Sequence, residues 1–262
     1  MREVSSSGED GAMSDEGGAM SEEALAKRLG FDSDVVARVR AIAGGDALTV
    51  VEQGGYAEEH DADGEDGPES AAGETPDVAL LVSVPRETSP EVLRQLREAL
   101  VPRGYLPFRI DESYAEENPT DSIAVLKTGD KFAPVRFCRT NGINYAVDTD
   151  AVLAKLADWD RRLGVTVLGA EFDSLYVTFD RLPQDLAAFA EELYEFCPDL
   201  LDQGLEVMVD EAFEYLSEEQ QELVQARLDE DEGDEDGTAH RVALRMLADE
   251  VARHRSVSFW WD

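Results

Sequence analysis

Apolar positions in this chain repeat with two different periods, which alternate along most of its length. Apolar runs of about four to eight residues predict strands, whereas apolar residues at i, i+3, i+4 and i+7 predict amphipathic helices. The predicted strands are residues 48–51, 78–84, 105–110, 123–127, 165–168 and 175–179, and the predicted helices are about 21–29, 34–43, 89–101, 148–163 and 183–197. This order of elements predicts an α+β fold, with a mixed or antiparallel sheet and helices packed on it.

The helix predicted from Pro183 has the strongest pattern. Its apolar stripe ends at Cys197, and Pro198 stops the helix. The sequence then ends in the aromatic run 259–261, which would be poorly placed in water. We therefore expect a final strand that closes the sheet, with one of Trp260 and Trp261 in the core and the other left to line a pocket or meet a partner.

A tight hairpin is predicted at Asn141-Gly142. The flanking residues 135–139 and 143–147 resemble strands, and both residues of an Asn-Gly pair accept the positive φ of a type I′ turn. Such a hairpin would place Arg139 near Asn144, where a guanidinium and an amide could hold a carboxylate or a phosphate.

Composition divides the chain into four parts. Residues 1–20 read as an acidic, disordered tail, residues 21–53 as a small helical segment, and residues 54–76 as an acidic linker. Residues 77–262 form the α+β domain, with further helical patterns and an acidic spacer inserted at about 205–255.

The charge is extreme: 59 acidic residues stand against 23 basic ones, a net charge of −36, and only four of the basic residues are lysine. Molar salt shortens the screening length to about 3 Å and relieves the resulting self-repulsion. We therefore interpret the surface as halophilic rather than as a nucleic-acid mimic. Because no basic stripe accompanies the acidic surface, we expect no nucleic-acid partner.

Other features of the sequence predict the cellular location of the protein. No apolar run approaches the ~20 residues of a membrane helix, and residues 1–20 lack the apolar core of a secretory signal. The two cysteines, Cys138 and Cys197, do not make a disulfide framework. We expect a cytoplasmic protein with reduced thiols and no membrane partner.

The usual catalytic and metal patterns are missing from the sequence. Cys197 follows a helix C-terminus, where the dipole disfavours a thiolate, and its spacing places it on the apolar stripe. The three histidines, His60, His240 and His254, show no metal spacing with the cysteines. The acidic run 229–236 lacks the alternating ligands of a calcium loop, and no phosphate loop is present. We therefore expect no metal and no cofactor.

Several blocks, in order, resemble a bacterial and archaeal family known as domain-of-unknown-function family 4253. They are residues 140–145, the helix around Trp159-Asp160, residues 168–173, the block 189–204 and the terminal 259–262. The resemblance covers roughly residues 78–262 and implies a compact α+β domain, without an activity, cofactor or substrate. The chain departs from the family pattern between residues 204 and 256.

Two functional hypotheses remain open. The first is a non-enzymatic module that binds a protein or a small molecule, one version being an immunity-type protein that blocks a toxin. The second is an enzyme acting on a small anionic substrate, with Asp173, Asp199 or Asp202 as acid or base and Arg139 as anion clamp. The candidate ligand-binding residues are Arg139, Asn141, Asn144, Tyr145, Asp173, Asp199, Asp202, Gln203 and Trp260.

Overall fold

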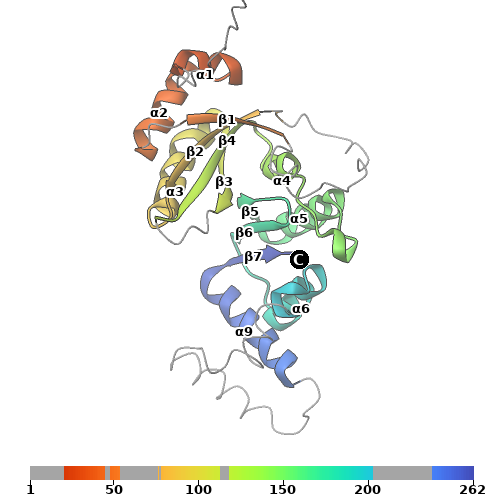
Figure 1. Ribbon diagram of the computed structural model, residues 1–262. Coiled ribbons are helices and arrows are strands. Elements are labelled where there is room, and N and C mark those ends of the chain that lie inside the picture. The colour runs from red at the N-terminus through yellow and green to blue at the C-terminus, as the bar shows by residue number, and fades with distance from the viewer. Residues whose placement is uncertain (1–20, 45–47, 54–75, 77, 113–117, 203–237) are drawn as a thin grey trace, which may run out of the picture.

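The computed structural model describes residues 21–44, 48–53, 76, 78–112, 118–202 and 238–262, and the elements within them form one sheet with helices on both faces (Figure 1). The strands are β1 (Leu48–Glu52), β2 (Val78–Pro85), β3 (Tyr105–Glu112), β4 (Thr120–Lys127), β5 (Val165–Ala170), β6 (Ser174–Phe179) and β7 (Ser256–Trp260). The α-helices are α1 (Glu22–Leu29), α2 (Ser33–Ala43), α3 (Ser89–Leu100), α4 (Ala133–Cys138), α5 (Thr149–Leu163), α6 (Leu186–Phe196) and α9 (Thr238–His254).

The sheet has seven strands in the order β1-β2-β4-β3-β5-β6-β7. Neighbouring strands are antiparallel except at β3 and β5, which are parallel and share a single paired position, Arg109 with Gly169. The α+β class, the mixed sheet and the position of the C-terminal strand at the end of the sheet are confirmed.

The sparse join between β3 and β5 is reinforced by an arginine from α3. Nη1 of Arg97 donates to the carbonyl of Pro107 on β3 at 2.7 Å and to that of Val167 on β5 at 3.2 Å. Burial lowers the pKa of this guanidinium, but it retains hydrogen-bond acceptors on both sides of the join. Arg97 therefore links the two halves of the sheet.

One face of the sheet is covered by α4, α5 and α6, and its core is aromatic. Trp159 of α5 stacks on Phe259 of β7 with ring centroids 5.6 Å apart, and Phe259 stacks in turn on Trp261 at 5.9 Å. Phe196, the last residue of α6, meets all three rings edge to face. The closing strand is thus packed into the core through alternate residues.

On the opposite face, the described helices α1, α2 and α3 pack over β1 to β4, and Leu168 of β5 packs against the same cluster (Figure 1). Leu25 of α1 and Val36 of α2 are fully buried in one cluster with Leu80 of β2. β1 pairs antiparallel with β2 along its whole length. Residues before position 53 therefore contribute a strand and two helices to the same core as the rest of the sheet.

The predicted hairpin at Asn141-Gly142 is wrong. Residues 133–138 form helix α4, which ends at Arg139 with φ 53°, and Ile143–Tyr145 is a short 3-10 helix, η2. Gly142 has φ −124°, outside the type I′ range, because the Asn141 side chain instead accepts from the Ile143 amide at 3.1 Å. The Asn-Gly pair forms a local turn rather than a link between two strands.

The strongly patterned helix starts later than predicted, at Leu186, where the Asp185 carboxylate accepts from the Ala188 amide at 3.0 Å. It ends at Phe196, and Cys197 is extended and fully buried. The predicted tail 1–20, most of the linker 54–76, and the helical patterns and spacer 205–237 lie outside the described residues.

We predict that Leu25→Ala lowers the free energy of global unfolding by about 2–5 kcal/mol, because it leaves a cavity in a core shared with the sheet. Glu23→Gln, on the exposed side of the same helix, is the control. Denaturant unfolding in molar salt, with hydrogen exchange on the β2 amides, measures both. Unchanged β2 protection in Leu25→Ala would mean that the N-terminal helices unfold independently of the sheet.

Candidate functional site

Four segments that are distant in sequence meet at the end of the sheet where β5 turns into β6. They are residues 140–145, 171–173, 196–202 and 260–262, which we call the turn cluster. Most of the predicted ligand-binding residues belong to these segments. The sequence showed them as separate polar blocks, and the fold brings the blocks together.

The segment after α4 is fixed to the β5–β6 turn by hydrogen bonds. The hydroxyl of Thr140, which is fully buried, donates to the carbonyl of Glu171 at 2.6 Å. The Asn141 amide donates to the carbonyl of Phe172 at 2.8 Å. On the same turn, the carbonyl of Asp173 accepts from the Trp261 amide at 2.9 Å, so the turn also holds the end of β7.

Gly142 is required by space rather than by backbone conformation. A Cβ on Gly142 would stand 2.5 Å from Cδ1 of Trp261, much closer than atoms in contact. The Trp261 indole is itself held, because its Nε1 donates to the carbonyl of Phe196 at 3.3 Å. The turn therefore packs its backbone directly on the tryptophan ring.

Asp199 is the buried carboxylate of the cluster, with 2% of its surface exposed. Its Oδ1 accepts from the Tyr145 hydroxyl, and its Oδ2 accepts from the Asp262 amide at 2.9 Å. The hydrogen bond to Asp199, with burial and the charges of Asp199 and Asp202, raises the pKa of Tyr145 to about 12. At neutral pH the phenol is therefore a hydrogen-bond donor and not a general base.

Both cysteines are buried thiols. Burial raises the pKa of Cys197 to about 12, and its Sγ donates to the carbonyl of Trp260 at 3.1 Å. Burial also raises the pKa of Cys138 well above its ordinary value, and its Sγ donates to the carbonyl of Ala170 at 3.1 Å. Neither environment favours the thiolate that a nucleophile needs.

Eight of the nine predicted residues divide into three groups. Tyr145 and Asp199 share a hydrogen bond, and Asp202 is close enough to act on the Tyr145 phenol. Asn141 bonds to Phe172, and Asp173 takes part only through its backbone carbonyl, which accepts from Trp261. Arg139 and Asn144 are exposed, and the hairpin that would have set them side by side is not there. Gln203 lies outside the described residues.

Trp260 belongs to a different surface. Alternate residues of β7 are buried, so Trp261 faces the core whereas Trp260 is 45% exposed on the other face of the sheet. The alternation of the two tryptophans was readable from the sequence, but the direction of each was not.

Sequence reasoning missed Ile143, the most exposed large apolar side chain in the described structure, with 74% of its surface open. The only sequence signal for Ile143 was an aliphatic residue between polar residues in a turn.

Sequence reasoning also missed Arg109 and Tyr176, whose guanidinium carbon and ring centre lie 5.6 Å apart on the face that carries Trp260. Their strands are far apart in sequence, so no local pattern joins them.

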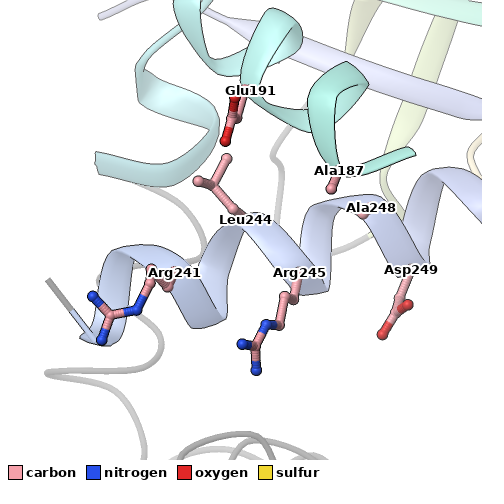
Figure 2. A pocket seen from close by; sticks show the side chains of 7 residues that line it. All are labelled: Ala187, Glu191, Arg241, Leu244, Arg245, Ala248 and Asp249. Atoms are coloured by element: carbon pink, nitrogen blue, oxygen red, sulfur yellow. The ribbon is translucent and has the colours of Figure 1, made fainter. Parts of the chain in front are cut away.

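A shallow groove of about 260 Å³ lies elsewhere, between α6 and α9 (Figure 2). Ala187 of α6 faces Ala248 of α9, and these small side chains let the helices approach closely. Leu244 points from α9 toward Glu191 of α6. The groove contains none of the residues predicted from the sequence.

The described residues lack two further features. They contain no group of three or more His, Cys, Asp or Glu placed to hold a metal ion. None of their helices has both the length and the apolar composition needed to cross a membrane.

We predict that Gly142→Ala destabilises the protein by about 1–3 kcal/mol, since the new Cβ must displace the Trp261 ring. Gly129→Ala is the matched control, because a Cβ there meets nothing within 4 Å. Urea unfolding followed by tryptophan fluorescence measures both. Equal stability of the two variants would contradict the close packing of the turn on Trp261.

The Tyr145–Asp199 pair predicts a pH dependence. The raised folded-state pKa means that this pair's contribution to stability is complete below pH about 10 and is lost as pH rises toward about 12. In Asp199→Asn the pKa of Tyr145 should fall toward its ordinary value, and in Asp202→Asn it should fall by less, because Asp202 acts only through its charge. Carbon-13 NMR of labelled tyrosine reads the titration, and an unchanged pKa in Asp199→Asn would exclude the pair.

Comparison with known proteins identifies the family. A family model described as a domain of unknown function, DUF4253, matches residues 122–262, more than half of the chain. No curated protein and no solved structure matches significantly. The match contains all four segments of the turn cluster, as well as α4 to α6 and β5 to β7. The chain belongs to the DUF4253 family.

Proposed function

We propose that this protein is a non-enzymatic binding module that engages another protein through the exposed side of the turn cluster. The observation that carries the proposal is the position of the exposed apolar side chains. Among the described residues four large apolar ones are exposed, and two of them, Ile143 at 74% and Tyr145 at 37%, both lie on the short helix η2. An exposed aliphatic residue beside a tyrosine is typical of the centre of an interface.

The groups beneath this surface support a binding role. Thr140, Asn141 and Asp199 form hydrogen bonds that fix the position of η2, and Gly142 rests on the Trp261 ring. A surface that is held rigid before binding loses little conformational entropy when a partner arrives. The most buried polar groups of the cluster thus support Ile143 and Tyr145.

A carboxylate-dependent enzyme is the weaker candidate. Both oxygens of Asp199 already accept hydrogen bonds from the protein, and the raised pKa of Tyr145 keeps the phenol protonated.

We propose a cytoplasmic location, because the two buried free thiols accord with a reducing compartment. An immunity-type role, in which the module covers a toxin, is one form of this proposal.

The test places a photo-reactive amino acid at position 143 and, as a control, at Val101, which is 44% exposed outside the turn cluster. We expect cross-links to one reproducible protein from position 143 and none to that protein from position 101, after irradiation of cells or of lysate in molar salt. Ile143→Asp should abolish co-purification of the same partner while leaving the melting temperature within about 2 °C of the parent, as for other surface changes. Identical cross-links from both positions would refute the proposal.

A further inference from the structure

The last strand of the sheet, β7, has a neighbouring strand on one side only within the described residues. At one end of the pair, the Trp261 amide donates to the carbonyl of Asp173 at 2.9 Å. At the other end, the Phe179 amide donates to the carbonyl of Arg255 at 2.8 Å. In an antiparallel pair such bonds recur at every second residue, so the residues between them point their amides and carbonyls away from the sheet. These outward residues are Ser256, Ser258 and Trp260.

Most of the outward backbone groups of β7 have no partner. Within the part of the chain that the structure describes, only the Trp260 carbonyl has one, the Sγ of Cys197 at 3.1 Å. Ser258 is exposed and Ser256 is half-buried. A row of unpaired amides and carbonyls at the edge of a sheet is a template for another strand. The sheet thus ends in backbone groups with which a further strand can pair.

The edge at β7 also lacks the features that usually prevent such pairing. Charged side chains, proline and β-bulges discourage pairing at an edge. β7 contains no charged residue and no proline, and its register with β6 is continuous. The opposite edge of the sheet differs, because β1 ends in Glu52, whose carboxylate lies 3.2 Å from the guanidinium of Arg28. Of the two edges, the one at β7 is therefore better suited to receive a strand.

The charges at the two ends of β7 favour a second copy of this chain as the added strand. Arg255 precedes β7 and Asp262 follows it, and both are exposed. The Arg255 guanidinium donates to the backbone carbonyl of Asp180 at 3.2 Å, and neither Arg255 nor Asp262 forms an ion pair among the described residues. When two copies of β7 run antiparallel, the basic end of each lies beside the acidic end of the other. A parallel arrangement would set like charges together.

One register of this pairing uses every outward residue of β7. With Ser258 opposite Ser258 of the second copy, Ser256 lies opposite Trp260, and outward amides face outward carbonyls. The Trp260 carbonyl can accept from a second amide while it accepts from Cys197, because a carbonyl oxygen has two lone pairs. Trp260, which is 45% exposed, then lies beside Ser256 of the second copy. The strand is therefore complementary to itself.

We propose that two copies of this chain pair through β7, antiparallel about a two-fold axis at Ser258, and so form one continuous sheet. The interface is small, because a strand of five residues is about 17 Å long and a stable interface covers ~800 Å² on each partner. The dimer is therefore weak and reversible. Molar salt favours it, because salt screens the repulsion between two chains that each have a net charge of −36.

The first experiment is sedimentation equilibrium of the full chain in molar salt over a range of concentrations. We expect a monomer–dimer equilibrium with a Kd of about 10–100 μM, which weakens as the salt is lowered. Ser258→Pro removes the amide at the two-fold axis, and an edge strand tolerates proline at such a position, so dimerisation should weaken about tenfold or more. Ser258→Ala is the matched control. It keeps the backbone groups and should dimerise within about twofold of the parent.

A disulfide tests the register. Opposite residues that exchange both hydrogen bonds in an antiparallel pair have Cα atoms about 5.5 Å apart, a separation that a disulfide can span. Ser258→Cys should therefore form an intermolecular disulfide on mild oxidation. Ser174→Cys, on the same face but one strand further in, should not, because the two β6 strands would be about 14 Å apart. The native thiols of Cys138 and Cys197 are buried.

Three results would each overturn the proposal. One is a chain that stays monomeric up to about 1 mM in molar salt. The others are folded Ser258→Pro protein that dimerises like the parent, and cross-linking at position 174 as efficient as at position 258. Ile143→Asp, which tests the turn cluster, should leave dimerisation unchanged. Loss of the dimer in that variant would assign self-association to the turn cluster and not to β7.

Discussion

The stack of Trp159, Phe259 and Trp261 is the contact on which the rest of this half of the molecule depends. It joins α5 to the closing strand, and Phe196 completes it from the end of α6. Only alternate residues of β7 can take part, so burial of Phe259 and Trp261 obliges Trp260 to face outward. The turn cluster rests on Trp261, whereas Trp260 is exposed on the other face of the sheet. The support beneath the proposed protein-binding surface thus follows from the register of one strand.

Charge imposes a second constraint, because basic partners are scarce in this chain. Glu192 shows how they are used: its carboxylate accepts from Arg162 at 2.6 Å and from the Trp159 indole at 2.8 Å. Burial opposes ionisation of Glu192, but these hydrogen bonds together with the positive charges of Arg162 and Lys155 outweigh burial and lower its pKa. Glu192 therefore links Trp159 of the aromatic stack to the surface residue Arg162. Elsewhere, single arginines such as Arg97 donate hydrogen bonds to backbone carbonyls.

Local patterns were sufficient to predict most elements and insufficient to predict how they meet. Apolar periodicity placed the main strands and the helix ending near Cys197, because burial on one face dictates that spacing. It failed at Asn141-Gly142, where a short apolar stretch fits a strand or one turn of helix equally well. Hydrogen bonds from Asn141 to Phe172 and from Thr140 to Glu171 hold this segment in its observed conformation. No local sequence pattern predicts these long-range bonds. Asp199 was selected as a candidate from its place after the helix stop, but its hydrogen-bond partner Tyr145 is 54 residues away in the sequence.

The position of β3 has a consequence for the extent of the folding unit. The family match begins at residue 122, inside β4, yet β3 precedes that point and lies between β4 and β5. The matched residues of this chain, taken alone, would have a sheet with an inner strand missing and with the backbone groups of β4 unpaired on both sides. The family's sequence signature is therefore shorter than the structural unit that carries it: earlier residues supply an interior part of the sheet and are no mere appendage to it.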